Sequence, residues 1–163
     1  MTVSAAVLTA PHEQLQVERL ELADPGTGEV RVRYGASGVC HSDLHCVDGE
    51  WTVPLPLVLG HEGAGTVEAL GPGVTGLEVG DHVVLSWRYA CGRCRACVRG
   101  RSWACTNTRM GDCTLDDGTL RFQRGDGTEV YSTSPWERSP RPRWCRRRRP
   151  SGFPPSSHLT SPA

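Results

Sequence analysis

We predict a mainly β fold, a small barrel or sandwich with irregular loops, from two features of the sequence. Short segments of alternating or β-branched apolar residues occur at residues 4–8, 15–22, 29–35, 65–70 and 81–86. Long apolar patterns with the 3.6-residue period of a helix are scarce. The 163 residues have room for one domain of ordinary size or for a fragment of a larger protein.

Most of the expected elements are strands, and GEVRVRYG at residues 28–35 is the clearest of them. Residues 37–49 predict one helical turn that begins near Ser37. The glycines of GPGVTG at residues 71–76 match the dinucleotide pattern G-x-G-x-x-G, but that pattern needs a following helix to hold the pyrophosphate. The strand-like sequence LEVGDHVVLS follows instead, so we interpret these glycines as a hairpin loop.

Charge divides the chain into two parts that are expected to behave differently. Residues 1–131 carry 11 Arg against 17 acidic residues, a net charge of −6, whereas residues 132–163 carry 7 Arg against Glu137, a net charge of +6. The second part, called the tail below, also has 7 Pro and 7 Ser and almost no apolar periodicity. It cannot bury enough apolar surface to offset its conformational entropy, so we predict that it is disordered.

The sequence gives no sign of export or membrane insertion. No signal-peptide pattern stands at the N-terminus, and no apolar run approaches the 18 residues of a membrane span. We therefore expect a cytoplasmic protein without a membrane partner. Eight cysteines in such a protein favour metal or thiol chemistry over a disulfide framework.

The strongest motif is CGRCRACVRGRSWAC, with the cysteine spacing C-x2-C-x2-C-x7-C. Four thiolates that converge on one tetrahedral ion form a structural zinc site. A [4Fe–4S] cluster is a rival, although its usual spacing closes with C-x3-C-P, and unmetallated or disulfide-linked cysteines are a second alternative. Interleaved arginines are expected to offset the negative charge of the thiolates. The predicted ligands of this cysteine lobe, residues 88–113, are Cys91, Cys94, Cys97 and Cys105.

A second, more dispersed set of metal-binding residue types stands in GVCHSDLH and LGHEGAG. Cys40 and His61 supply two of the three protein ligands that a catalytic zinc needs, with water or substrate in its fourth position. A buried cysteine with an unrelated loop histidine is the alternative that chemistry alone leaves open.

Four blocks occur in the order found in the zinc-dependent medium-chain alcohol dehydrogenase family, which the chain resembles over residues 5–131. They are GVCHSDLH, GHEGAGTVEALGPGV, the cysteine lobe and DDGTLRF. The resemblance implies an incomplete GroES-like β-barrel catalytic domain over residues 1–131. Full-length members follow this domain with a Rossmann domain that binds NAD, a domain that we expect this chain to lack.

The resemblance also implies metal-site roles for individual residues. Cys40 and His61 would be ligands of the catalytic zinc, and Glu62 the adjacent carboxylate that can approach the metal. Asp43 would orient the His61 ring. The cysteine lobe would hold the structural zinc.

Three further positions concern the proton and the cofactor. Ser42 and His45 would relay the alcohol proton, and His41 would face the cofactor pyrophosphate. Cys46 and Cys113 match no ligand position, and we interpret them as ordinary small apolar residues.

The family pattern ends after GTEVYS at residues 127–132, before the third zinc ligand and the Rossmann domain. Back-translation of the tail in a shifted frame gives phrases that resemble the family's next strand, so we interpret residues 132–163 as frameshifted. This chain alone is then expected to be inactive, to bind catalytic zinc weakly or not at all, and to remain unassociated. Its full-length parent would act on a small alcohol or aldehyde with NAD and form oligomers.

An alternative of another class is a noncatalytic zinc-binding module whose basic tail contacts nucleic acid. We do not expect a nucleic-acid partner, because the arginines of the tail disappear in the shifted frame.

Overall fold

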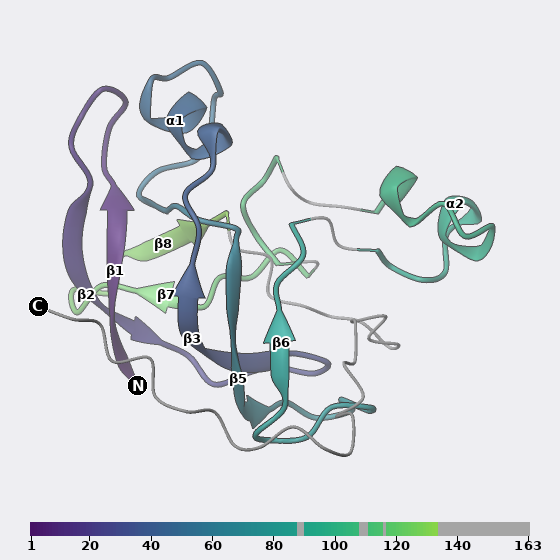
Figure 1. Ribbon diagram of the computed structural model, residues 1–163. Coiled ribbons are helices and arrows are strands. Elements are labelled where there is room, and N and C mark those ends of the chain that lie inside the picture. Colours follow the sequence, from purple (N-terminus) through teal and green to yellow (C-terminus); the bar gives the residue numbers. More distant parts are fainter. Residues whose placement is uncertain (88–89, 108–110, 116, 134–163) are drawn as a thin grey trace, which may run out of the picture.

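Two β-sheets form the body of the chain in the computed structural model, which describes residues 1–87, 90–107, 111–115 and 117–133 (Figure 1). The predicted disorder and frameshift of the tail therefore fall almost wholly outside the described residues, as does the tail of the nucleic-acid alternative. The prediction of a mainly β fold is confirmed.

The first sheet is a closed barrel with the strand order β1-β2-β7-β8-β4. The pairs are antiparallel except for the parallel pair of β4 and β8. Val7, Leu20 and Val130 are fully buried at its centre, where apolar burial is the main stabilising contribution. The five strands are β1 (Thr2–Leu8), β2 (Gln16–Leu22), β4 (Leu57–Val58), β7 (Phe122–Gln123) and β8 (Glu129–Ser132).

The second sheet has three antiparallel strands in the order β3-β5-β6, with β3 at Val30–Ser37, β5 at Gly63–Leu70 and β6 at His82–Val84. The GPGVTG segment lies between β5 and β6, so its interpretation as a hairpin loop is confirmed. Gly71 is required there for space, since a Cβ atom on it would lie 1.8 Å from the backbone oxygen of Gly26.

Helices are short and stand outside the sheets (Figure 1). Helix α1 (His41–Val47) begins four residues later than the turn predicted near Ser37, because Cys40 forms its N-cap. Helix α2 (Arg95–Val98) and the 3₁₀ helix η1 (Ser102–Ala104) belong to the cysteine lobe. Within the described part of the chain, no helix has the length and apolar character needed to cross a bilayer.

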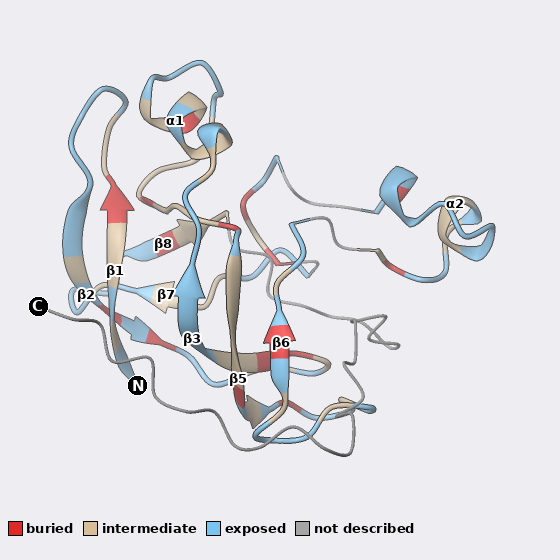
Figure 2. Cartoon of the chain, viewed as in Figure 1, coloured by how far each residue is buried: buried red, intermediate tan, exposed pale blue. Residues whose placement is uncertain are grey.

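Buried residues concentrate in the strands, and the cysteine lobe projects from the body with most of its surface exposed (Figure 2). A buried ion pair joins the start of β3 to the segment before β7. Glu29, which is 1% exposed, accepts two hydrogen bonds from the Arg121 guanidinium at 2.9 and 2.8 Å. A third bond to this carboxylate comes from the Gly26 N–H at 2.8 Å. The pair thus ties together segments that lie 92 residues apart.

Candidate metal centres

The cysteine lobe brings all four predicted cysteines together. One sulfur atom from each of Cys91, Cys94, Cys97 and Cys105 lies within 4.8 Å of the others, and the Cys94 and Cys105 sulfurs are 4.0 Å apart. Four sulfurs at such spacing suit the tetrahedral coordination of zinc.

Backbone N–H groups of the lobe point at these sulfurs. Cys94 N–H donates to the Cys91 sulfur at 3.3 Å, Cys97 N–H donates to the Cys94 sulfur at 3.5 Å, and Cys91 N–H donates to the Cys105 sulfur at 3.4 Å. Asn107, which no sequence motif indicated, donates from its side-chain amide to the Cys91 sulfur at 3.5 Å. Such bonds favour the thiolate form that metal binding requires.

The four thiols differ in acidity because their surroundings differ. The backbone hydrogen bond from Cys97, with a second from Thr106, lowers the pKa of Cys94 to about 5. Desolvation and the hydrogen bond with Cys94 raise the pKa of Cys97 to about 12. Without a cation the crowded sulfurs oppose joint ionisation, and a divalent cation would remove that repulsion. The donor set therefore fits a zinc ion.

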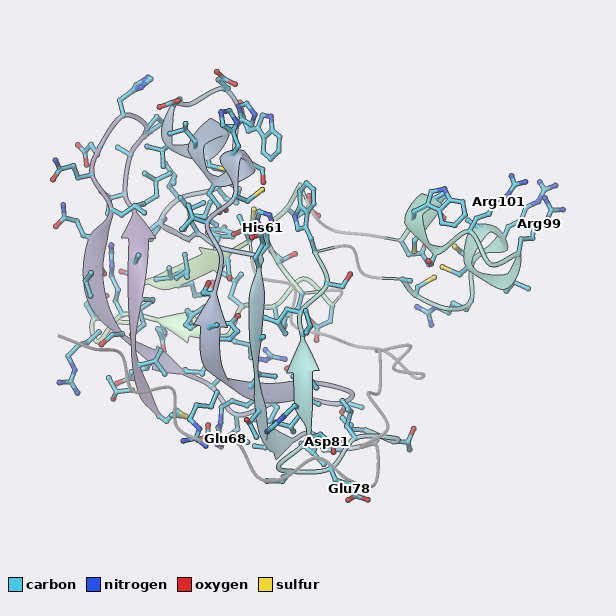
Figure 3. The ribbon with its side chains drawn as sticks, in the orientation of Figure 1. His61, Glu68, Glu78, Asp81, Arg99 and Arg101 are labelled. Carbon is cyan, nitrogen blue, oxygen red and sulfur yellow. The ribbon has the colours of Figure 1, made fainter. Side chains whose placement is uncertain are left out.

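The interleaved arginines of the lobe, Arg93, Arg95, Arg99 and Arg101, are all exposed. Arg99 and Arg101 point outward from the end of the lobe (Figure 3). Residues 90–107 contain no acidic residue, so the arginines give the lobe a positive field. Their contribution to neutralising the thiolates is long-range, since the described bonds to the lobe sulfurs come from backbone groups, Asn107 and the Cys94 thiol.

A second cluster of donor residues lies at the N-terminal ends of helix α1 and strand β5. Ligand atoms of Cys40, His61 and Glu62 lie within 4.8 Å of one another. Cys40 is the N-cap of α1, and His61 and Glu62 immediately precede β5. Gly38 makes room for the third donor, because a Cβ atom there would lie 2.2 Å from a carboxylate oxygen of Glu62. The sequence predictions did not include Gly38.

Asp43 links the helix start to the histidine. Its Oδ2 accepts the Cys40 N–H at 3.2 Å, which fixes the side chain. Its buried Oδ1 lies 3.3 Å from His61 Nδ1, an electrostatic contact in which Oδ1 makes no well-aligned hydrogen bond. The Nδ1 atom of His61 thus faces Asp43, and its Nε2 atom faces the cluster.

Two further side chains contact the second cluster. They are Ser42, which the sequence predicted, and Trp87, which it did not. The Ser42 hydroxyl donates to the Cys40 sulfur at 3.0 Å and lies 3.3 Å from His61 Nε2. The Trp87 ring stacks on His61 with centroids 4.8 Å apart. His61 itself is 5% exposed, so its ring has little freedom to turn.

His41 and His45 form a separate group on the same helix. Their rings meet edge to face with centroids 4.8 Å apart, and His45 also stacks on Trp51 at 5.1 Å. The His45 Nδ1 atom pairs with the carboxylate of Glu50, another residue that the sequence did not single out. Among the described contacts, the structure brings Ser42 to the donor cluster and His45 to this histidine group.

The remaining two cysteines of the described chain behave as small buried residues. Cys46 and Cys113 are buried and form no disulfide, and neither belongs to a donor cluster. Burial raises the pKa of Cys46, and it raises the pKa of Cys113 to about 11. Both therefore carry protonated thiols near neutral pH.

Comparison with known proteins decides the family. The family model described as "Alcohol dehydrogenase GroES-like domain" matches residues 26–136, which is more than half of the chain. The chain belongs to this family. The sequence-based expectation of a GroES-like domain of the alcohol dehydrogenase family is thereby confirmed.

Three relatives illustrate the match. The chain is 48% identical over 133 residues to the NDMA-dependent alcohol dehydrogenase of Amycolatopsis methanolica, covering 79% of this chain and 35% of that one. The structure of benzyl alcohol dehydrogenase from Acinetobacter calcoaceticus superposes with a TM-score of 0.73 at 36% identity. An alcohol dehydrogenase zinc-binding domain protein from Burkholderia ambifaria gives 0.72 at 39% identity. In both structures the match covers 82% of this chain and 36% of the other. The chain thus spans about a third of the length of these dehydrogenases.

Proposed function

We propose that this chain supplies the zinc-binding part of the catalytic domain of an alcohol dehydrogenase that transfers hydride between an alcohol or aldehyde and NAD. The observation that carries the proposal is the convergence of Cys40, His61 and Glu62 beside Asp43. The family membership and the cysteine lobe support it. The described cysteines form no disulfide, which suits the reducing cytoplasm, where we place the protein.

Each donor cluster has a separate task in this proposal. The four sulfurs of the cysteine lobe hold a structural zinc that stabilises a loop with little core of its own. Cys40 and His61, with Glu62 alongside, hold the catalytic zinc. When bound, that zinc supplies Lewis acidity that lowers the pKa of an alcohol.

The other residues of the site position groups and move protons. Asp43 keeps the Nδ1 face of His61 occupied, so the Nε2 lone pair is directed into the cluster. The Ser42 hydroxyl lies within 3.3 Å of His61 Nε2 and can pass the alcohol proton on. His45, paired with Glu50, would take it to solvent. His41 is exposed on the same helix, where it can meet a cofactor phosphate.

Catalysis by this chain alone is not expected. The described residues contain no βαβ unit, the element that binds a dinucleotide. Both sheets of the described chain are antiparallel except for the β4–β8 pair. When the 163-residue chain is incubated with NAD and a series of alcohols, NADH absorbance should not rise. Turnover at a rate typical of a dehydrogenase would contradict this proposal.

A chimera tests the catalytic assignment directly. Residues 1–133 are joined to the downstream two thirds of the Amycolatopsis methanolica enzyme, and turnover and zinc content are measured. Replacing Asp43 by asparagine should lower activity or catalytic-zinc affinity about 10–100-fold, because His61 loses its charged partner. Asp48→Asn, at the exposed C-cap of α1, is the matched control and should change neither. Equal effects of the two substitutions would refute the role given to Asp43.

A further inference from the structure

Two histidines of helix α1 belong to neither donor cluster and lie close together. His41 and His45 are four residues apart, which places them on the same side of a helix. Their ring centres are 4.8 Å apart and the ring planes meet at 74°. Two imidazoles on one ion have ring centres about 4.5–5.3 Å apart, because metal–nitrogen bonds are about 2.1 Å long. The observed separation therefore suits two ring nitrogens on a single ion.

Both rings have a nitrogen available for an ion. The Nδ1 atom of His45 pairs with the carboxylate of Glu50, which favours the neutral ring with its hydrogen on Nδ1 and its lone pair on Nε2. A carboxylate behind a histidine ligand in this way is a regular feature of metal sites. Among the described contacts, His41 forms no hydrogen bond or ion pair, so either of its nitrogens can bind.

The His45 ring is held in place by the residue that follows Glu50. The Trp51 ring stacks on it with centroids 5.1 Å apart and planes at 28°, and the Trp51 N–H donates to the His45 carbonyl oxygen at 3.1 Å. A ligand that is already ordered loses less conformational entropy on binding. The His45 side chain is still 30% exposed and His41 is exposed, so an ion can reach both from solvent.

The charge around the two histidines selects a cation. Residues 37–51 contain three acidic residues, Asp43, Asp48 and Glu50, and no arginine. This segment therefore attracts cations, whereas the cysteine lobe carries the opposite charge. Imidazole nitrogen suits divalent late transition ions such as nickel, copper and zinc, while calcium and magnesium prefer oxygen ligands.

We propose that His41 and His45 form a third metal site, which takes a divalent late transition ion such as Ni²⁺ through two imidazole nitrogens. Glu50 and Trp51 position the His45 ring for it. A bound ion occupies the nitrogen that His45 needs to accept the alcohol proton, so metal binding and proton transfer exclude each other. This last consequence rests on the proposed function.

Calorimetry with NiCl₂ on the full, zinc-loaded 163-residue chain tests the site. We expect one Ni²⁺ per chain, with affinity lowered at least tenfold by His41→Ala or His45→Ala and about 10–100-fold by Glu50→Gln. His82→Ala is the matched control, because His82 is an exposed histidine of β6 outside the pair. It should leave the affinity unchanged within about twofold. Absence of binding, or equal weakening by all three histidine variants, would overturn the proposal.

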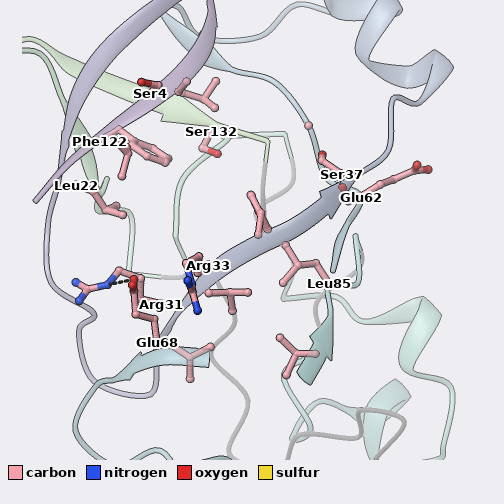
Figure 4. A pocket seen from close by; sticks show the side chains of 18 of the residues that line it. Ser4, Leu22, Arg31, Arg33, Ser37, Glu62, Glu68, Leu85, Phe122 and Ser132 are labelled. Carbon is pink, nitrogen blue, oxygen red and sulfur yellow. Dashed lines mark hydrogen bonds and ion pairs between the residues drawn. The ribbon is translucent and has the colours of Figure 1, made fainter. Parts of the chain in front are cut away.

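The second donor cluster offers Ni²⁺ another set of ligands and needs its own control. Its Glu62 side chain is exposed and extends outward from the end of a 550 Å³ apolar cleft between the two sheets (Figure 4). Cys40→Ser removes one donor from that cluster. Retention of Ni²⁺ binding in Cys40→Ser would support the histidine pair, and its loss would place the ion at the second cluster and overturn the proposal.

Nuclear magnetic resonance on the unmodified chain gives a readout that depends on no variant. Ni²⁺ is paramagnetic and broadens the imidazole C–H signals of the histidines that bind it. At substoichiometric Ni²⁺ the signals of His41 and His45 should broaden before those of His12 and His82. Broadening that begins at His61 or His82 would contradict the proposed site.

Turnover by the chimera separates this proposal from the proposed function. A chimera that is inactive without Ni²⁺ would count against the proposed function alone, because the third site is tested by binding. In an active chimera, Ni²⁺ should inhibit turnover at the concentration that fills the site. Full turnover with the site filled would overturn the exclusion of proton transfer by the metal.

Discussion

Replacing Glu29 by glutamine is expected to lower the free energy of unfolding by about 3–5 kcal/mol, because it leaves the Arg121 guanidinium without its charged partner. Glu29 is 1% exposed and receives hydrogen bonds from both Arg121 and the Gly26 N–H. The loss would loosen the junction between the start of β3 and the segment before β7. Urea unfolding followed by circular dichroism measures the change.

The chain contains a matched control for this prediction. Glu18 also receives two hydrogen bonds from one arginine, Arg124, both at 2.7 Å. Its side chain and that of Arg124 are 23% and 28% exposed, so water screens the pair. Glu18→Gln should therefore cost only about 0–1 kcal/mol. Similar decreases in the free energy of unfolding for Glu29→Gln and Glu18→Gln would show that burial does not set the strength of the two ion pairs.

Replacing Cys97 by serine should weaken zinc binding by the cysteine lobe about 10²–10³-fold. Structural zinc sites contribute about 10–16 kcal/mol, so one of four equal ligands carries a few kcal/mol. Competition with a chromophoric chelator measures the affinity. Cys113→Ala is the control, since Cys113 is buried outside both donor clusters. An unchanged affinity in Cys97→Ser would remove this cysteine from the site.

Local patterns accounted for most of the strands and for the cysteine lobe. Alternating apolar residues marked β1, β2, β3, β5 and β6, and close cysteine spacing marked the lobe, because neighbours in sequence dominate these features. Cys40 and His61 were paired through the family resemblance, since 21 residues separate them in the chain. The structure places their ligand atoms in one cluster with Glu62.

Features that depend on distant contacts were not predictable from the sequence. The strands β4 and β7 have two residues each, too few for any periodic signal, yet they close the barrel. The burial of Glu29 depends on Arg121, 92 residues away. Gly38, Trp87 and Asn107 are ordinary residues in the sequence and become important only through contacts made by folding.

Positive and negative charges are divided between the cysteine lobe and the rest of the described chain. Four exposed arginines and no acidic residue occur in residues 90–107, whereas residues 1–87 carry 12 acidic residues against 3 Arg. The lobe is therefore a positive projection on a negative body (Figure 3). A zinc ion bound by four thiolates would lower this positive charge, so metal loading should alter the salt dependence of any association through the lobe.

Zinc X-ray absorption spectroscopy on the purified 163-residue chain, combined with its zinc content, tests the central claim most directly. The account predicts one firmly held zinc per chain with a shell of sulfur ligands at about 2.3 Å. It also predicts that Cys97→Ser weakens this zinc binding about 10²–10³-fold and that Cys40→Ser leaves it unchanged. Absence of zinc, or a shell of nitrogen and oxygen ligands, would contradict the assignment of this chain as the zinc-binding part of an alcohol dehydrogenase.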